Sequence, residues 1–180
     1  MSSLLLRPWH PGDAADLCLL YQSSPDLGTQ FNQALPDQNS AERFIQTSLT
    51  FDPDVACNFA IELNGMAVGN VGISNINRRH LSAWVYYWLS SDARGQGLAT
   101  RAAATLSSWA MEDLGIFRLE LGHRINNPAS CKVALGSGFL AEGVERSKLQ
   151  YGDERFDVET HARLRTDPTP AVELLPVQLY

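Results

Sequence analysis

The feature that most constrains this chain is a glycine-containing turn between a strand-like and a helix-like segment. The apolar run Trp84–Leu89 precedes residues 94–100, which read Arg-Gly-Gln-Gly-Leu-Ala-Thr, and helical periodicity then continues to Leu114. Such a turn points several backbone N–H groups at one place, where the positive end of the helix macrodipole favours an anion. Gly95 and Gly97 lack a Cβ, so a diphosphate can approach the main chain closely. The sequence therefore predicts a phosphate site here, with added positive charge from Arg94.

This turn differs from the two commonest nucleotide-binding loops. It lacks the Gly-Lys-Ser/Thr ending of a P-loop, so no lysine reaches a terminal phosphate and no hydroxyl is supplied for magnesium. It also lacks the third glycine of the dinucleotide-binding fingerprint. Taken alone, the pattern leaves two interpretations open, a phosphate site and a plain strand–turn–helix junction.

Length and charge exclude several classes of protein. With 180 residues the chain is long enough for one core and short for two domains, so we expect one domain over residues 1–166 and a C-terminal tail over residues 167–180. A formal net charge of −6 argues against nonspecific binding to nucleic acid. No apolar run approaches the roughly 20 residues of a membrane span, and the start of the chain is not typical of a signal peptide. We expect a cytoplasmic protein without a membrane partner.

The three cysteines do not form a recognisable motif. Cys18, Cys57 and Cys131 are odd in number, far apart in the sequence and outside any metal-ligand spacing. Neither a disulfide framework nor a zinc site is predicted from them. We expect them to be reduced and mostly in the core.

Apolar periodicity predicts a series of strands and helices along the chain. Strands are expected over residues 4–9, 58–63, 68–74, 81–90, 117–121, 139–150 and 156–165. Helices are expected over residues 14–21, 39–49, 98–114 and 127–138. This order predicts an α/β fold in which one mixed sheet is layered with helices.

Some local features are predicted in more detail. Asp13 is a candidate N-cap of the first helix, and Asn64-Gly65 meets the positive-φ requirement of a type I′ hairpin turn. Residues 23–38 are expected to form a long loop or irregular helix with isolated apolar anchors. Residues 166–180 contain three prolines. Fraying is the default expectation for such an end, and docking of the apolar residues 174–177 on the body is the alternative.

A second motif lies on the predicted helix near residue 127. Asn127-Pro128-Ala129-Ser130, followed by Gly138-Phe139 and Glu142-Gly143, resembles the Asn-x-x-Ser…Gly-Phe…Glu-Gly block of the RimJ/RimL branch of GNAT acetyltransferases. Arg94-x-x-Gly97-x-Ala99 is similar to the signature of the pyrophosphate loop in that superfamily, and residues 86–89 (Tyr-Tyr-Trp-Leu) look like the strand before it. The resemblance extends from about residue 3 to about residue 165.

The resemblance implies both a fold and an activity. The implied fold is α/β (α+β), with a single mixed, mostly antiparallel central sheet flanked by helices. The implied activity is transfer of the acetyl group of acetyl-CoA, by direct attack, to a primary amine. Enzymes of this branch acetylate N-terminal α-amines of proteins, notably of ribosomal proteins, and relatives are commonly monomers or homodimers. A small-molecule acceptor (an amino acid, polyamine or amino sugar) and a noncatalytic acyl-CoA-binding module remain as alternatives.

Carried over residue by residue, the resemblance also implies a set of site residues. Ser130 would protonate the leaving thiolate, and no metal is expected. The residues implied to bind acetyl-CoA are Trp88, Leu89, Arg94, Gly95, Gln96, Gly97, Leu98, Ala99, Thr100, Asn127 and Ser130. Helix capping is the alternative role for Asn127 and Ser130.

The group that would accept the proton of the amine is not evident from the sequence. Many enzymes of the family carry a glutamate where this chain has Trp84. Glu120 and His123 on the next predicted strand could act directly or through a water, and a solvated or salt-bridged role is the alternative for either. An α-amine with a pKa near 8 costs about 1 kcal/mol to deprotonate at pH 7, whereas a lysine costs about 4–5 kcal/mol. An N-terminal amine therefore hardly needs a strong base.

Overall fold

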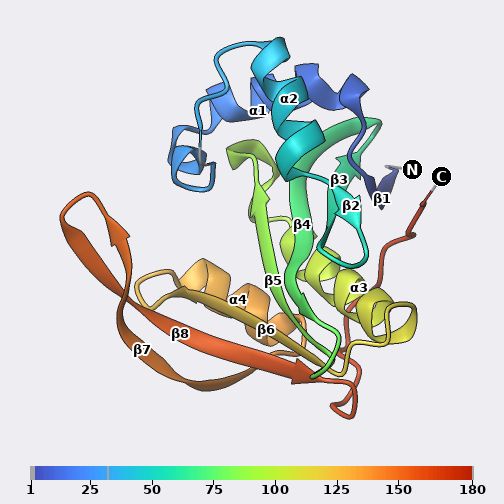
Figure 1. Cartoon of the computed structure of the whole chain (residues 1–180), viewed down its shortest axis with the longest axis vertical. Helices are drawn as coiled ribbons and strands as arrows, with labels where there is room; N and C mark the ends of the chain where they lie inside the picture. The colour runs from blue at the N-terminus through green and yellow to red at the C-terminus, as the bar shows by residue number, and fades with distance from the viewer. Residues whose placement is uncertain (1–2, 32, 180) are drawn as a thin grey trace.

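The computed structural model describes residues 3–31 and 33–179, which form one eight-stranded sheet with helices on both faces (Figure 1). The strand order is β1-β3-β4-β5-β6-β8-β7, and β2 pairs with β3. Within the described ranges every paired strand is antiparallel to its neighbour except β5 and β6. The predicted mixed, mostly antiparallel sheet is confirmed. Three predicted segments include residues outside the description: the chain start (residues 1–2), the long loop (residue 32) and the tail (residue 180).

The elements follow the predicted order with small shifts at their ends. The strands are β1 Leu4–Pro8, β2 Phe51–Asp52, β3 Ala56–Leu63, β4 Met66–Asn77, β5 Ser82–Leu89, β6 Arg118–Arg124, β7 Leu140–Tyr151 and β8 Glu154–Leu164. The α-helices are α1 Ala14–Ser23, α2 Gln38–Ser48, α3 Leu98–Glu112 and α4 Pro128–Gly136, with 3-10 turns at Pro11–Asp13, Pro25–Thr29 and Ser91–Ala93. None of the helices in the described parts of the chain is long and apolar enough to cross a membrane.

The predicted hairpin turn is confirmed, and Asp13 occupies the predicted N-cap position of α1 but without a capping hydrogen bond. Asn64 and Gly65 have φ of 53° and 82°, the positive values that a type I′ turn requires. Asp13 does not cap α1 with its side chain. Its carboxylate instead accepts hydrogen bonds from the Arg7 guanidinium at 2.8 Å and from the His10 N–H at 2.8 Å. A charged partner nearby in the fold thus outweighs the local capping role.

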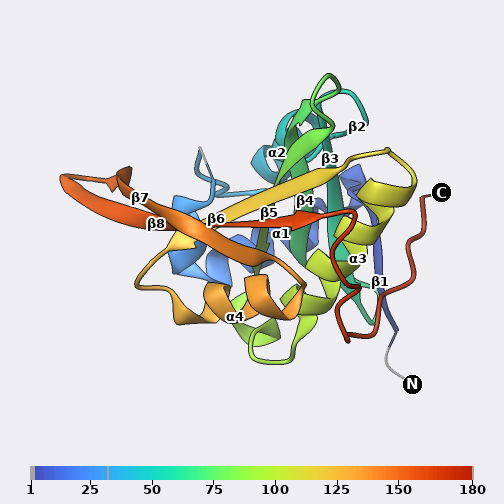
Figure 2. The same cartoon turned by 90° about the horizontal axis from the view of Figure 1, so that it is seen from below.

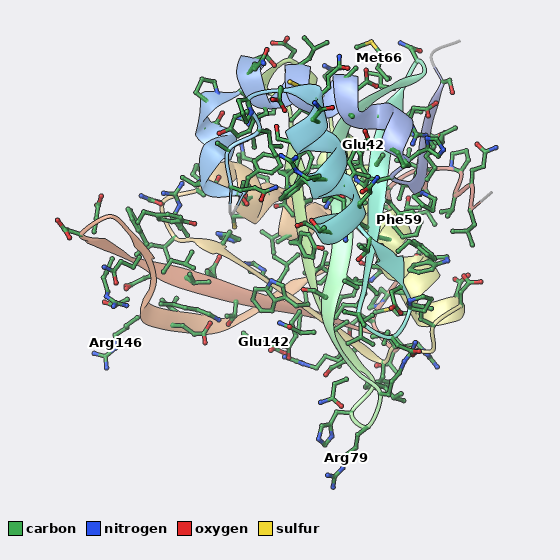
Figure 3. The ribbon with its side chains drawn as sticks, turned by 45° about the horizontal axis from the view of Figure 1, so that its top comes forward. Glu42, Phe59, Met66, Arg79, Glu142 and Arg146 are labelled. Atoms are coloured by element: carbon green, nitrogen blue, oxygen red, sulfur yellow. The ribbon has the colours of Figure 1, made fainter. Side chains whose placement is uncertain are left out.

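Two apolar cores lie on opposite faces of the sheet. The helices α3 and α4 cover one face, where Leu106 and Trp109 pack with strand residues such as Phe59. The other face is covered by α1, α2 and the loop between them, and Trp88 of β5 packs into that core. Figure 2 shows α3 and α4 on the same side of β6 and β8. In Figure 3 the labelled side chains of Arg79 and Arg146 point away from both cores, into solvent.

The strands β5 and β6 separate after a short stretch of pairing. Ser82–Trp84 pair with Arg118–Glu120, and beyond these three pairs the two strands form no ladder in the described structure. Because β5 continues to Leu89 and β6 to Arg124, the sheet opens between them, as Figure 1 shows. The turn from β5 into α3 lies at the end of this opening.

The C-terminal segment packs on the body of the protein. Leu175 is 5% exposed, and its N–H donates to the Thr105 hydroxyl at 2.8 Å. The Leu6 N–H donates to the Pro176 carbonyl at 2.9 Å, and the Gln178 N–H donates to the Leu6 carbonyl at 2.8 Å. The segment therefore protects the outer edge of β1. The expectation of a frayed end is wrong here, because the edge that holds the segment is a product of the fold.

The docking of this segment leads to a stability prediction. Leu175→Ala should lower the free energy of unfolding by about 2–4 kcal/mol, because a buried leucine is replaced by a cavity. Leu174→Ala is the matched control, since Leu174 is 40% exposed, and should change it by less than about 0.5 kcal/mol. Urea unfolding of both variants measures the difference. Equal effects would contradict the docked arrangement.

Candidate active site

The turn between β5 and α3 has the geometry of an anion site. Gly95 and Gly97 have φ of 73° and 75°, a region that is strained for residues with a Cβ. Gly97 is the N-cap of α3, and its end of the helix has no side-chain cap. A Cβ built on either glycine would meet no other described atom within 4 Å, so the main chain borders open space there. The first N–H groups of α3 are thus placed to bind an external anion.

Arg94 is held by the turn itself. Its Nε and Nη2 atoms donate to the carbonyl of Leu89 at 3.1 Å and 2.9 Å, and its Nη1 atom lies 2.7 Å from the carboxylate of Asp26. Gln96 likewise donates through Nε2 to the carbonyl of Asp92 at 3.0 Å. Both side chains fix the shape of the loop, and the pairing with Asp26 offsets part of the charge of Arg94. Backbone N–H groups are therefore the main donors that this turn can offer a phosphate.

The remaining residues implied to bind the cofactor have side chains that pack within the protein, so they can offer a ligand mainly their backbone atoms. Leu98 and Ala99 are buried in the first turn of α3. Thr100 packs against α4, where a Cβ built on Gly136 would lie 2.9 Å from its methyl group. The ring of Trp88 packs 5.2 Å from that of Phe31 on the α1–α2 face. Only the backbone of Trp88 is left for a ligand in the opening beyond β5.

A cleft of about 260 Å³ lies where β5 and β6 diverge. Its walls include Tyr87 of β5, His123 of β6, Ser130 of α4 and Tyr151 of β7. The predicted residues Asn127 and Ser130 are therefore brought to the same hollow as the splayed strands. The cleft is open to solvent between the two arms of the sheet, which leaves room for a long, narrow ligand.

Asn127 combines two roles in the structure. Its Oδ1 atom accepts the N–H of Ser130 at 3.1 Å, which caps α4. The capping interpretation is thus confirmed for Asn127. The cap uses the backbone of Ser130 and not its hydroxyl, and both residues also line the cleft. The Ser130 hydroxyl stays a candidate proton donor.

The sequence interpretation missed Tyr87 as a second hydroxyl at this position. The Tyr87 hydroxyl donates to the carbonyl of Ser130 in a long contact of 3.4 Å. Burial raises the pKa of Tyr87, so the phenol keeps its proton at neutral pH and can act as a donor. Strand alternation could have indicated this residue, because it places Tyr87 and the core residue Val85 on the same face of β5.

The structure separates Glu120 from Ser130. Glu120 alternates along β6 with Leu119 and Leu121, which face the α3–α4 core, so its carboxylate lies on the opposite face. It accepts a hydrogen bond from Arg118 Nε at 2.6 Å and lines a second hollow beside Trp84. The salt-bridged alternative fits this residue, and its assignment as a base gains no support from its neighbours.

His123 lines the cleft, but both of its ring nitrogens already have partners. Nδ1 lies 3.0 Å from the carbonyl of Arg124, and Nε2 lies 3.1 Å from Nε2 of His161. Neither nitrogen is free to take a proton from an amine in the cleft. The two bases considered from the sequence are thus both engaged elsewhere.

Comparison with known proteins decides the family. A family model described as an acetyltransferase (GNAT) domain matches residues 3–140. The chain belongs to the GNAT acetyltransferase family. It is an acetyl-CoA-dependent acetyltransferase, as the two sequence motifs implied.

Individual relatives of this GNAT protein cover most of its length. The Bacillus subtilis (strain 168) protein YdaF, provisionally named a ribosomal N-acetyltransferase, is 26% identical over 174 residues, 91% of this chain and 92% of YdaF. Spermidine N(1)-acetyltransferase of Escherichia coli (strain K12) is 28% identical over 143 residues, 74% of this chain and 77% of that enzyme. A structure of RimL, a ribosomal alpha-N-protein acetyltransferase in complex with coenzyme A, has a TM-score of 0.80 at 23% identity, over 90% of this chain and 94% of RimL. This last likeness shows the fold.

The features of the site fit acetyl-CoA as the donor substrate of this GNAT enzyme. The uncapped end of α3 suits the diphosphate, and the opening between β5 and β6 suits the extended arm that leads to the thioester. The thiolate that leaves on acetyl transfer needs a proton, and the hydroxyls of Ser130 and Tyr87 border the cleft where one is required. None of these steps calls for a metal.

The anion site leads to a binding prediction at Gly97. Gly97→Glu should abolish coenzyme A binding, because it places a negative charge and bulk where a diphosphate meets the backbone. Any side chain is strained at φ 75°, so Gly97→Ala is the matched control, with a similar stability loss of about 1–2 kcal/mol. Calorimetric titration should show that only the Glu variant loses more than about a hundredfold in affinity. If the two variants bind coenzyme A with similar affinity, the turn is not part of the coenzyme A site.

The two hydroxyls lead to a kinetic prediction. Ser130→Ala should lower kcat by roughly ten- to a thousandfold with little change in coenzyme A affinity, as expected for a proton donor to the leaving thiolate. Tyr87→Phe removes the neighbouring hydroxyl and should have the smaller effect. A larger loss of kcat in Tyr87→Phe than in Ser130→Ala would identify Tyr87 as the proton donor to the thiolate. A lower melting temperature with unchanged kcat in Ser130→Ala would leave Ser130 with a structural role alone.

Proposed function

We propose that this acetyltransferase acts on the N-terminal α-amine of a protein or peptide. The observation that carries the proposal is the lack of an unengaged base among the candidates around the cleft. Trp84 stands where many relatives have a glutamate, Glu120 is paired with Arg118, and both nitrogens of His123 have partners. An acceptor that is already partly neutral at pH 7 suits such a site.

Deprotonation costs separate the possible acceptors. An α-amine with a pKa near 8 costs about 1 kcal/mol to deprotonate at pH 7, and a lysine-like amine costs about 4–5 kcal/mol. The primary amines of a polyamine belong to the more basic class. The difference of about 3 kcal/mol corresponds to roughly a hundredfold in rate if the free amine is the reacting form.

The relatives support the same choice of acceptor. YdaF is named for ribosomal N-acetylation, and RimL is named an alpha-N-protein acetyltransferase. The likeness to spermidine N(1)-acetyltransferase makes a polyamine the second candidate. For the cellular setting we propose the cytoplasm, which the three free cysteines support, since such thiols are typical of a reducing compartment.

The proposed reaction is a direct transfer. The neutral α-amine attacks the thioester carbonyl carbon, the C–S bond breaks, and an amide forms. The thiolate takes a proton from the hydroxyl of Ser130 or Tyr87, and that hydroxyl regains a proton from solvent. The amine loses its extra proton to solvent, so no side chain of the enzyme has to ionise first. Backbone N–H groups at the end of β5 can stabilise the oxyanion that develops during attack.

This mechanism predicts both acceptor choice and pH dependence. A peptide with a free N-terminus should react about a hundredfold faster than the same peptide with a blocked N-terminus and an internal lysine, and faster than spermidine. The value of kcat/KM should rise with pH up to the amine pKa of the substrate and then level off. Release of free thiol from acetyl-CoA measures all of these rates.

Two peptides with different N-terminal pKa values provide the control. The inflection of kcat/KM should move with the peptide. An inflection at one fixed pH for every substrate would show an enzymic base and overturn the mechanism. A preference for spermidine over all peptides would overturn the choice of acceptor but leave the acetyltransferase activity in place.

A further inference from the structure

Four side chains from three elements converge beside the cleft. They are His123 of β6, Cys131 of α4, and Glu159 and His161 of β8. One nitrogen, sulfur or carboxylate oxygen from each lies within 4.8 Å of every other. We name these residues the β6–α4–β8 cluster. None of the four takes part in the proposed acetyl transfer, and only His123 also lines the cleft.

Four of the six distances between the donor atoms lie close to those of a tetrahedral zinc site, and the other two are within 4.8 Å. Zinc binds nitrogen and oxygen at about 2.0–2.2 Å and sulfur at about 2.3 Å, which places ligand atoms about 3.3–3.7 Å apart in a tetrahedron. In the cluster, Nε2 of His161 lies 3.1 Å from Nε2 of His123 and 3.0 Å from Oε2 of Glu159. Oε2 of Glu159 lies 3.4 Å from Nε2 of His123 and 3.8 Å from Sγ of Cys131. A small shift outward of each atom would admit the ion at the centre.

The protonation of His123 prepares one ligand for a metal. Its Nδ1 atom faces the carbonyl of Arg124 at 3.0 Å, and a carbonyl can only accept, so Nδ1 carries the proton. In the neutral ring, Nε2 then carries a lone pair, which faces Nε2 of His161 inside the cluster. Metal-bound histidines are commonly held in this way, with the second nitrogen donating to a backbone carbonyl.

Hydrogen bonds alone satisfy this cluster poorly. Nε2 of His161 lies within bonding distance of both His123 and Glu159, yet a ring nitrogen has only one proton or one lone pair to offer. Its other nitrogen, Nδ1, is buried without a partner among the described residues, and it would carry the ring proton when Nε2 binds a metal. A metal ion would use the lone pairs of both histidines at once.

Charge and access also favour a divalent cation. Two neutral imidazoles, a thiolate and a carboxylate carry two negative charges, which a divalent ion neutralises in a largely buried place. The side chains of His123 and His161 are 5% and 0% exposed, whereas that of Glu159 is 32% exposed and leaves a route from solvent. The mixture of nitrogen, sulfur and oxygen donors suits zinc and excludes calcium and magnesium, which require oxygen.

We propose that the β6–α4–β8 cluster binds one zinc ion. Four protein ligands close the coordination shell, so the role is structural: the ion joins α4, which carries Asn127 and Ser130, to the two strands behind it. The proposal does not depend on the acceptor, because acetyl transfer itself needs no metal.

Metal analysis of the whole protein tests this proposal. Protein made in zinc-containing medium and then dialysed should retain about one zinc per chain, and zinc added to chelator-treated protein should raise its melting temperature. Cys131→Ser and Glu159→Gln should each weaken zinc binding by about a hundredfold or more. Both residues are partly exposed, so these variants should fold, which circular dichroism can verify. His80→Gln and Cys18→Ser change residues outside the cluster and should bind zinc as the unaltered protein does.

Cobalt substitution provides an independent readout. Cobalt(II) bound by the unaltered protein should show the visible absorption of a tetrahedral site together with a thiolate charge-transfer band, and Cys131→Ser should lose that band. The proposal is overturned if the unaltered protein neither retains zinc nor changes its melting temperature at saturating zinc. Binding that persists unchanged in both Cys131→Ser and Glu159→Gln would overturn it as well.

Discussion

The separation of β5 from β6 is the constraint on which the rest of this structure depends. Three residue pairs join the two strands, and the sheet then continues as two diverging arms. Because the pair is parallel, it needs a crossover connection, and α3 supplies it. The same connection sets the N-terminus of α3 at the end of the opening. One topological feature thus creates both the cleft and the anion site that serves it.

The turn between β5 and α3 offers an anion its backbone more than its side chains. Gly95 and Gly97 adopt positive φ and leave the backbone bare. Arg94, the one cationic residue of the turn, contacts Leu89 and Asp26 and mainly fixes the shape of the loop. A macrodipole and oriented N–H groups are fixed by the backbone, so they cost no side-chain entropy when the ligand binds. The structure of the turn therefore favours an anion through the shape of the loop more than through its charge.

Helix α4 connects the chemistry to the body of the protein. Asn127 caps it, Ser130 faces the cleft, and the next residue, Cys131, faces Glu159 on β8. The position of Ser130 is therefore coupled to the contacts that Cys131 makes with β8. A zinc ion in the β6–α4–β8 cluster would make that coupling rigid, and the separate long contact from Tyr87 holds the helix from the side of β5.

The sequence alone determined the features that arise from local patterns. Periodicity predicted the order of strands and helices, Asn64-Gly65 predicted the hairpin, and two short motifs predicted the family. Only the tertiary structure decided contacts between segments distant along the chain, such as the docking of Leu175 against Thr105 and the approach of Cys131 to two histidines and a glutamate. These depend on strand register and on which edges the sheet leaves open. No window of neighbouring residues carries that information, because each contact is made by side chains whose spacing is set by the fold.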